Sequence, residues 1–121
     1  MYKKLENILN KNYEYTENPE VERSKEFAKA YKKIVERQIQ LYGYELVNFS
    51  EGYCECSGFI TNGQNFIYFS SGDYRWSDIY NDILIRTAKG PTDYRGGYNQ
   101  HCTLNTLGHK ANEMFEKDFN R

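Results

Sequence analysis

The sequence predicts an α+β domain, with an antiparallel sheet of three to four strands covered by a long N-terminal helix and a C-terminal helix. Residues 18–42 have the apolar period of a helix, residues 45–88 alternate with the period of strands, and the residues after 103 return to helical spacing. The chain has 121 residues, only 2 prolines and no Gly/Ser-rich linker. We therefore expect a single domain that spans residues 1–121.

Two helices are expected before the sheet. The first lies within residues 1–17, where one apolar face consists of Leu5, Ile8 and Leu9. The second has Asn18 as a candidate cap, Pro19 at its first position and Gly43 at its end. Apolar residues recur at helical spacing between these limits, which predicts a helix of about 25 residues. A helix this long covers the sheet and offers a surface to a second copy.

The strands are predicted from period-two alternation with many β-branched and aromatic residues. Their expected ranges are Glu45–Ser50, Gly52–Thr61, Gln64–Phe69 and Tyr80–Ala88. Asn62-Gly63 predicts a two-residue hairpin between the second and third strands, in which Phe59 faces Phe66. Ser70–Asp73 is expected to end the third strand.

Residues 89–102 show no apolar periodicity and contain Gly90-Pro91 and Gly96-Gly97, so they are predicted to form a loop. Loops of this length are uncommon in compact domains and often carry function. Thr103 then caps the predicted final helix, whose apolar face extends from Leu104 to Phe119.

Composition argues against several classes of partner. The 16 basic and 17 acidic residues give a net charge of −1, whereas proteins that bind long nucleic acids usually have a basic surface. No segment approaches the ~20 apolar residues of a membrane helix, and no secretory signal is visible. With 3 cysteines, a disulfide framework is not indicated, so we expect a cytoplasmic protein with no membrane partner.

The usual catalytic motifs are missing, so the sequence predicts a protein that is not an enzyme and has no cofactor. There is no Walker-type glycine loop, no nucleophile elbow and no pair of histidines at metal spacing. Cys54-x-Cys56 and His101-Cys102 offer four zinc-ligand types, but zinc knuckles usually have two to four residues between paired cysteines. Buried free cysteines are the ordinary interpretation, and we expect no metal site.

Candidate ligand-binding residues gather in and near the predicted loop. They are Arg75, Trp76, Arg86, Thr87, Asp93, Tyr94, Arg95, Tyr98 and Asn99. Arginine binds phosphate through two parallel hydrogen bonds, and tyrosine or tryptophan stacks on bases. Asp93 and Asn99 suit ribose hydroxyls or base edges. A structural interpretation stays open, in which Thr87 and Asp93 make turn hydrogen bonds and Arg86 forms an ion pair with Asp82 or Glu55.

The run Arg86-Thr87-Ala88, followed by Asp93-Tyr94-x-Gly96-Gly97-x-Asn99, resembles a signature of small phage and prophage proteins. Together with the layout of the whole chain, it is similar to the Thoeris anti-defence (Tad) family of signal-sequestering proteins. The resemblance implies binding of a cyclic ADP-ribose-type nucleotide signal without cleavage, in the cytoplasm of an infected bacterium. It also implies a homo-oligomer, a dimer or larger.

Three alternatives remain at this stage. A phage-encoded protein inhibitor of the anti-CRISPR type would use the long helix or a tyrosine-rich surface against a host defence protein. A small nucleotide-acting enzyme would use Arg86 and Asp93 in active roles. A structural protein of a virus particle or mobile element would need no pocket.

Overall fold

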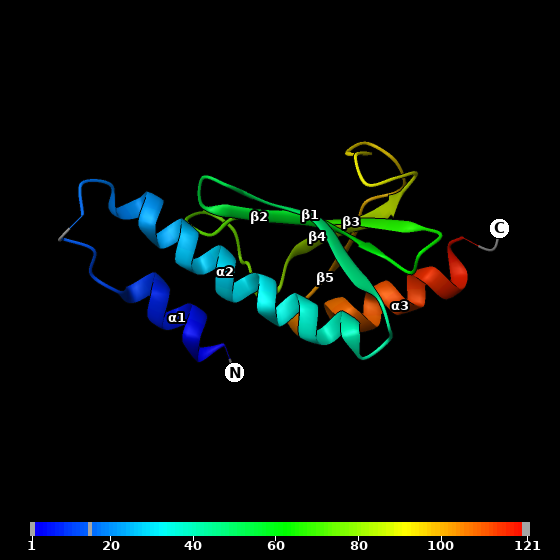
Figure 1. Ribbon diagram of the computed structural model, residues 1–121, viewed down its shortest axis with the longest axis horizontal. Coiled ribbons are helices and arrows are strands. Elements are labelled where there is room, and N and C mark those ends of the chain that lie inside the picture. The colour runs from blue at the N-terminus through cyan, green and yellow to red at the C-terminus, as the bar shows by residue number, and fades with distance from the viewer. Residues whose placement is uncertain (1, 15, 120–121) are drawn as a thin grey trace.

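A computed structural model describes residues 2–14 and 16–119 and contains a five-stranded antiparallel sheet with helices on one face (Figure 1). The elements are α1 (Lys3–Asn10), α2 (Pro19–Gln40), β1 (Glu45–Gly52), β2 (Glu55–Thr61), β3 (Phe66–Asp73), β4 (Ile83–Ala88), β5 (Gln100–Cys102), a 3₁₀ turn (Leu104–Thr106) and α3 (Leu107–Lys117). The strand order β1-β2-β3-β4-β5 follows the chain. The predicted α+β class with an antiparallel sheet is confirmed.

Helix α2 is the long helix that the sequence predicts, with 22 residues. Asn18 occupies the N-cap position and Pro19 the first turn, as expected, but the Asn18 side chain makes no capping hydrogen bond. The helix ends at Gln40, and Gly43 in the turn that follows takes a positive φ of 78°. Phe27, Tyr31 and Val35 form part of its buried face. Their burial supplies much of the driving force for packing this helix on the sheet.

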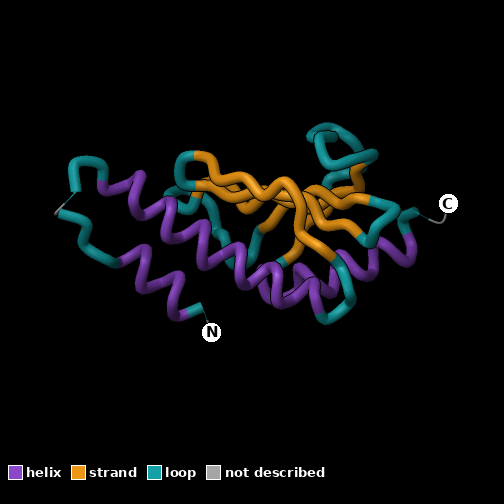
Figure 2. Tube along the Cα trace, viewed as in Figure 1, coloured by secondary structure: helices purple, strands orange, loops and turns teal. Residues whose placement is uncertain are grey.

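The main core lies between the helices and one face of the sheet (Figure 2). On the sheet side it contains Ile60, Ile67, Phe69, Ile83 and Ile85, all fully buried. Because strand residues alternate between faces, their neighbours in sequence point to the opposite face, which is called the outer face below. None of the helices within residues 2–14 and 16–119 has the length and apolar character needed to cross a lipid bilayer.

The predicted count of three to four strands was too low because β5 pairs with β4 inside the expected loop. Ile83 lies opposite Cys102 in this pairing. A three-residue strand shows no period in the sequence, and only contact with a distant strand defines it. The other predicted bounds also shift: β4 begins at Ile83 instead of Tyr80, and β3 continues to Asp73.

The hairpin between β2 and β3 has a four-residue turn, so the predicted two-residue turn was wrong. Thr61 pairs with Phe66, and Phe59 lies opposite Tyr68 instead of Phe66. The register shifts by two residues, which keeps Phe59 on the predicted face.

Side chains within this hairpin explain the wider turn. The Asn62 Oδ1 atom accepts the backbone N–H groups of Gln64 and Asn65 at 3.0 and 2.8 Å. The Thr61 hydroxyl donates to the carbonyl oxygen of Asn65 at 2.8 Å and accepts the N–H of Gly63 at 3.0 Å. These side-chain hydrogen bonds satisfy the backbone groups of the four-residue turn and stabilise it. A two-residue Asn-Gly turn does not need them.

Candidate functional site

The loop of residues 89–99 packs on the outer face of the sheet, away from the helices (Figure 1). The Tyr94 ring meets the rings of Phe59 and Tyr68 edge-on, with centroid distances of 5.3 and 5.6 Å. Phe59 is fully buried although it does not belong to the main core. Three aromatic rings therefore form a second, smaller cluster that fixes this loop on the sheet.

Arg86 holds the loop from the neighbouring strand. Its guanidinium carbon lies 4.9 Å from the centroid of the Tyr68 ring. The same group donates hydrogen bonds to the carbonyl oxygen of Tyr94 and to Asn99 Oδ1, the latter at 3.3 Å. The alternative ion pairs with Asp82 or Glu55 are not formed. Arg86 and Asn99 thus position the loop.

Asp93 organises the turn within the loop. Its carboxylate accepts the backbone N–H groups of Lys89, Arg95 and Gly96 at 2.9, 3.1 and 3.0 Å. These hydrogen bonds, first that from Lys89, lower the pKa of Asp93 from its ordinary value. A side chain at position 96 would place its Cβ 2.2 Å from the Asp93 carboxylate, so the carboxylate would have to move to admit it. Asp93 acts as a turn former in this conformation.

Gly97 lets the loop approach β4 closely. Its φ is +78°, and a Cβ here would lie 2.6 Å from both the carbonyl oxygen and the hydroxyl of Thr87. Both features exclude larger residues. The predicted pair of glycines is therefore used for conformation and for contact with Thr87.

A pocket of about 400 Å³ opens where this loop meets the C-terminal end of the chain. Thr87, Gly97, Tyr98, Gln100 and Asp118 line it. Tyr98 is 86% exposed, and Gln100 donates its side-chain N–H to Asp118 Oδ2 at 3.0 Å. The pocket therefore combines an available aromatic ring with hydroxyl, amide and carboxylate groups, which are the groups that recognise a sugar or a base.

Arg75 and Trp76 form a separate group at the tip of the sheet. The Arg75 guanidinium binds the Asp73 carboxylate through two hydrogen bonds of 3.1 and 2.7 Å. It also lies over the rings of Tyr53 and Trp76, at 4.7 and 5.7 Å from their centroids. Trp76 is 81% exposed. The three side chains Tyr53, Arg75 and Trp76, called the aromatic tip below, form a preorganised exposed surface.

The aromatic tip and the loop pocket do not meet within one chain. Thr87 pairs with Ile67 at one end of β3, and Asp73 ends the same strand six residues later. At about 3.4 Å per residue, the two ends are roughly 20 Å apart. Of the predicted site residues, Thr87 and Tyr98 line the pocket, whereas Tyr94 and Arg95 are exposed on the same loop but do not line it.

Three residues of this region escaped the sequence analysis. Gln100 and Asp118 complete the pocket, and Asn48 donates to the carbonyl oxygen of Pro91 at 2.7 Å from β1. Gln100 directly follows the candidate residue Asn99 inside the expected loop, so its place in the chain could have indicated it. Asn48 and Asp118 lie far along the chain from the loop and have no motif around them, and only the folded arrangement brings them there.

A carboxylate–imidazole pair was also missed. His101 Nδ1 lies 2.7 Å from Asp82 Oδ1, and both side chains are more than half exposed. A hollow of about 180 Å³ beside the pair is lined also by Ser70 and Ser77. Such a pair is a common element of general acid–base catalysis, whereas the sequence alone suggested His101 only as a metal ligand.

The three cysteines are free and buried. Burial raises the pKa of the Cys56 and Cys102 thiols to about 12, which disfavours the thiolate that binds metals. In the part of the chain that the structure describes, no group of three or more His, Cys, Asp or Glu residues is placed to hold a metal ion.

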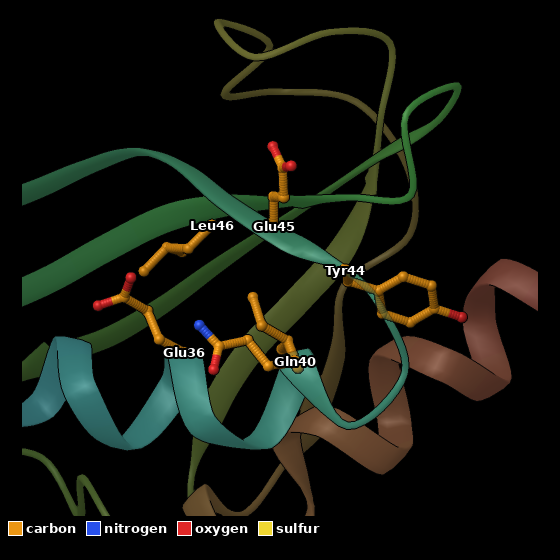
Figure 3. A pocket seen from close by; sticks show the side chains of 6 residues that line it. Glu36, Gln40, Tyr44, Glu45 and Leu46 are labelled. Carbon is orange, nitrogen blue, oxygen red and sulfur yellow. The ribbon is translucent and has the colours of Figure 1, made fainter.

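Another hollow, of about 240 Å³, lies between α2 and β1 (Figure 3). Its polar groups diverge: Glu45 points away from α2, and Tyr44 points toward α3, where its hydroxyl donates to Asn112 at 2.6 Å. Glu36 lies beside Leu46. These groups do not converge on one position, so the pocket at loop 89–99 is the stronger candidate site. No family model, no curated protein and no solved structure matches this chain.

Proposed function

We propose that this chain is a binding protein that holds a nucleotide-type small molecule in the pocket beside loop 89–99 and does not convert it. The observation that carries the proposal is the exposed Tyr98 ring at the edge of a pocket of about 400 Å³. Small-molecule sites commonly range from about 300 to 1,000 Å³ and combine apolar surface with a few placed polar groups.

The chemistry of the pocket suits the nucleoside part of such a ligand. Tyr98 offers a face for a base, and base–aromatic stacking contributes about 1–3 kcal/mol. Gln100 and Asp118 offer hydrogen-bond groups for ribose hydroxyls or a base edge. Arg95 is exposed on the same loop, and its side chain makes no hydrogen bond or ion pair within the described residues. This guanidinium is the cation that we assign to the phosphate.

Preorganisation supports tight binding. Arg86, Asp93 and Tyr94 fasten the loop before any ligand arrives, so little ordering entropy is lost on binding. A protein that sequesters a signal needs a low dissociation constant and no chemistry. The resemblance to the Thoeris anti-defence proteins narrows the proposal to a cyclic ADP-ribose-type signal, sequestered by a phage protein in the cytoplasm of its host. A homo-oligomer is part of the same proposal, and Leu41, 85% exposed, offers it an apolar contact.

A phage-encoded inhibitor of a host protein is the second candidate, and the aromatic tip favours it. Tryptophan, tyrosine and arginine are the residues most common at interface hot spots. Trp76→Ala should abolish capture of a protein partner under this alternative, and it should leave small-molecule binding unchanged under the first proposal.

The deciding experiment identifies the bound molecule. The purified protein is incubated with lysate from bacteria in which a TIR-domain defence has been triggered, washed and heat-denatured, and the released molecules are analysed by mass spectrometry. An intact cyclic ADP-ribose isomer, absent from a control protein, supports sequestration. A processed product indicates an enzyme, for which His101→Ala tests the carboxylate–imidazole pair. If the protein releases no molecule in larger amount than the control protein does, the proposal is contradicted.

Two variants locate the site. Tyr98→Ala should weaken binding of the identified molecule about 10- to 100-fold, in keeping with the loss of one stacking contact. Tyr53→Ala removes another exposed tyrosine, at the far end of β3, and is the matched control. Equal affinity of both variants and the unmodified protein would remove loop 89–99 from the proposal.

A further inference from the structure

A groove of about 280 Å³ runs between α1 and α2. Its floor is apolar, with Leu5 fully buried and Ala30 only 5% exposed. Three cationic side chains line it: Lys4 from α1, and Lys33 and Arg37 from α2. No carboxylate is among the residues that line the groove. The groove therefore combines a concave apolar surface with concentrated positive charge.

The rim cations differ from others on the same helix. Near the start of α2, Arg23 pairs with Glu20 and Lys25 with Glu22. Within the described residues, the side chains of Lys4, Lys33 and Arg37 make no ion pair or hydrogen bond.

The spacing of two of these cations makes them repel each other. Lys33 and Arg37 are four residues apart on one helix, where like charges repel. In a chain of net charge −1, three cations that make no ion pair at one place are a local feature and not a result of composition. A bound anion would relieve the repulsion.

The walls of the groove are fixed without a ligand. Tyr2, which also lines it, stacks on Tyr80 with a centroid distance of 5.5 Å and an interplanar angle of 4°. The Tyr2 hydroxyl donates to the side chain of Asn105. Leu5 anchors α1 in the main core. The groove thus has a defined shape to which a ligand can bind at low entropic cost.

We propose that this groove binds a phosphate-bearing small molecule, with at least two phosphate groups on Lys4, Lys33 and Arg37 and the remainder of the molecule on the apolar floor. A guanidinium binds phosphate through two parallel hydrogen bonds, and ammonium groups act as point charges. One monoester phosphate carries about −1.5 to −2 charges at pH 7, so three cations match more than one phosphate. The groove lies on the helix side of the sheet and loop 89–99 lies on the other side (Figure 1), so this site is independent of the function proposed above.

Calorimetric titration of the full chain with inorganic pyrophosphate tests the site directly. We expect one saturable site per chain with a submillimolar dissociation constant at low salt, and weaker binding as salt rises. The double variant Lys33→Ala/Arg37→Ala should lose at least tenfold in affinity. Lys25→Ala removes the same kind of charge from the same helix outside the groove and should bind within about twofold of the unmodified protein. Absence of a saturable site, or equal losses in control and double variant, overturns the proposal.

Thermal unfolding separates a binding defect from a folding defect. Because the double variant removes mutually repelling charges from exposed positions, it should melt at the same temperature as the unmodified protein or higher without anion. Pyrophosphate should raise the melting temperature of the unmodified protein and of Lys25→Ala, but not that of the double variant. A similar rise in all three would contradict the proposed site.

The phosphate groups can belong to a free metabolite or to a lipid headgroup. Co-sedimentation with vesicles of phosphatidylglycerol and phosphatidylcholine distinguishes these sources. If the protein sediments with the vesicles, if pyrophosphate reverses this, and if the double variant does not sediment, the groove binds a lipid headgroup. Pyrophosphate binding without sedimentation assigns it to a soluble molecule.

Discussion

Arg86 lies directly opposite Tyr68 in the pairing of β3 with β4, and its guanidinium carbon is 4.9 Å from the centroid of the tyrosine ring. From this position it reaches the carbonyl oxygen of Tyr94 and the side chain of Asn99. The sheet thus positions the arginine, and the arginine positions the loop.

Replacing Arg86 should loosen loop 89–99 and leave the main core intact. Hydrogen bonds to a charged group contribute about 1.5–3 kcal/mol, and an exposed cation–π contact about 0.5–1 kcal/mol. In Arg86→Ala we expect amide hydrogen exchange in residues 94–99 to accelerate at least tenfold, with unchanged protection in α2. Arg86→Lys should restore little of the protection, because lysine lacks the planar guanidinium that donates two hydrogen bonds at once. Equal protection of the loop in the variant and the unmodified protein would refute this role.

Gly97→Ala should displace the loop from β4. The new methyl group would lie 2.6 Å from the carbonyl oxygen of Thr87, at a φ of +78° that disfavours alanine. We expect a loss of about 1–3 kcal/mol, measured by urea unfolding, together with weaker ligand binding. Gly90→Ala in the same loop is the control, because its Cβ would meet no atom within 4 Å. Similar losses of stability in both variants would show that the close contact with Thr87 is not the cause of the loss in Gly97→Ala.

Loop 89–99 should also loosen in acid, because protonation of the Asp93 carboxylate weakens its hydrogen bonds to the backbone. Hydrogen bonds from the backbone of Lys89, Arg95 and Gly96 lower the pKa of Asp93 from the usual 3.8. The stabilisation is therefore fully present above about pH 4–5 and is lost as the pH falls through the lowered pKa.

The chemical shift of the Gly96 amide, followed from pH 7 to pH 2, reports this transition. Asp93→Asn should abolish the pH-dependent change, and the difference between the two titrations removes contributions from other carboxylates. A titration of Gly96 that is the same in both proteins would exclude Asp93 as its origin.

Phe59→Ala should destabilise the domain strongly although Phe59 lies on the outer face. The side chain is fully buried beneath Tyr94 and Tyr68, and truncation of a buried phenylalanine costs about 3–5 kcal/mol. Tyr94→Ala should cost less, because that residue is 52% exposed. Urea unfolding curves of both variants give the comparison. A cost below 1 kcal/mol for Phe59→Ala would mean that the loop does not cover this face.

The long helix and the strand-forming region were predictable because their signals are local. The apolar period that places Phe27, Tyr31 and Val35 on one face is present in the sequence itself, as is the alternation in β2 and β3. The hairpin was placed correctly, but its register was wrong. Its turn length depends on side-chain hydrogen bonds from Thr61 and Asn62, which the Asn-Gly pattern does not encode.

The candidate site was predictable only as a segment. Glycines and polar residues marked residues 86–99, but the roles of individual residues depend on what lies next to them. Arg86 and Asp93 were predicted to bind a ligand, and in the structure they hold the loop. Asp118, which lines the pocket, directly follows α3, far along the chain from the loop, with no motif around it.

The sequence by itself determined the class of fold and the order of most elements, since periodicity and turn chemistry act between residues close along the chain. The tertiary structure alone decided that β5 exists, that loop 89–99 covers Phe59, and that the aromatic tip lies far from the pocket. These features depend on contacts between residues distant in sequence, whose free energy is gained only when the chain has folded.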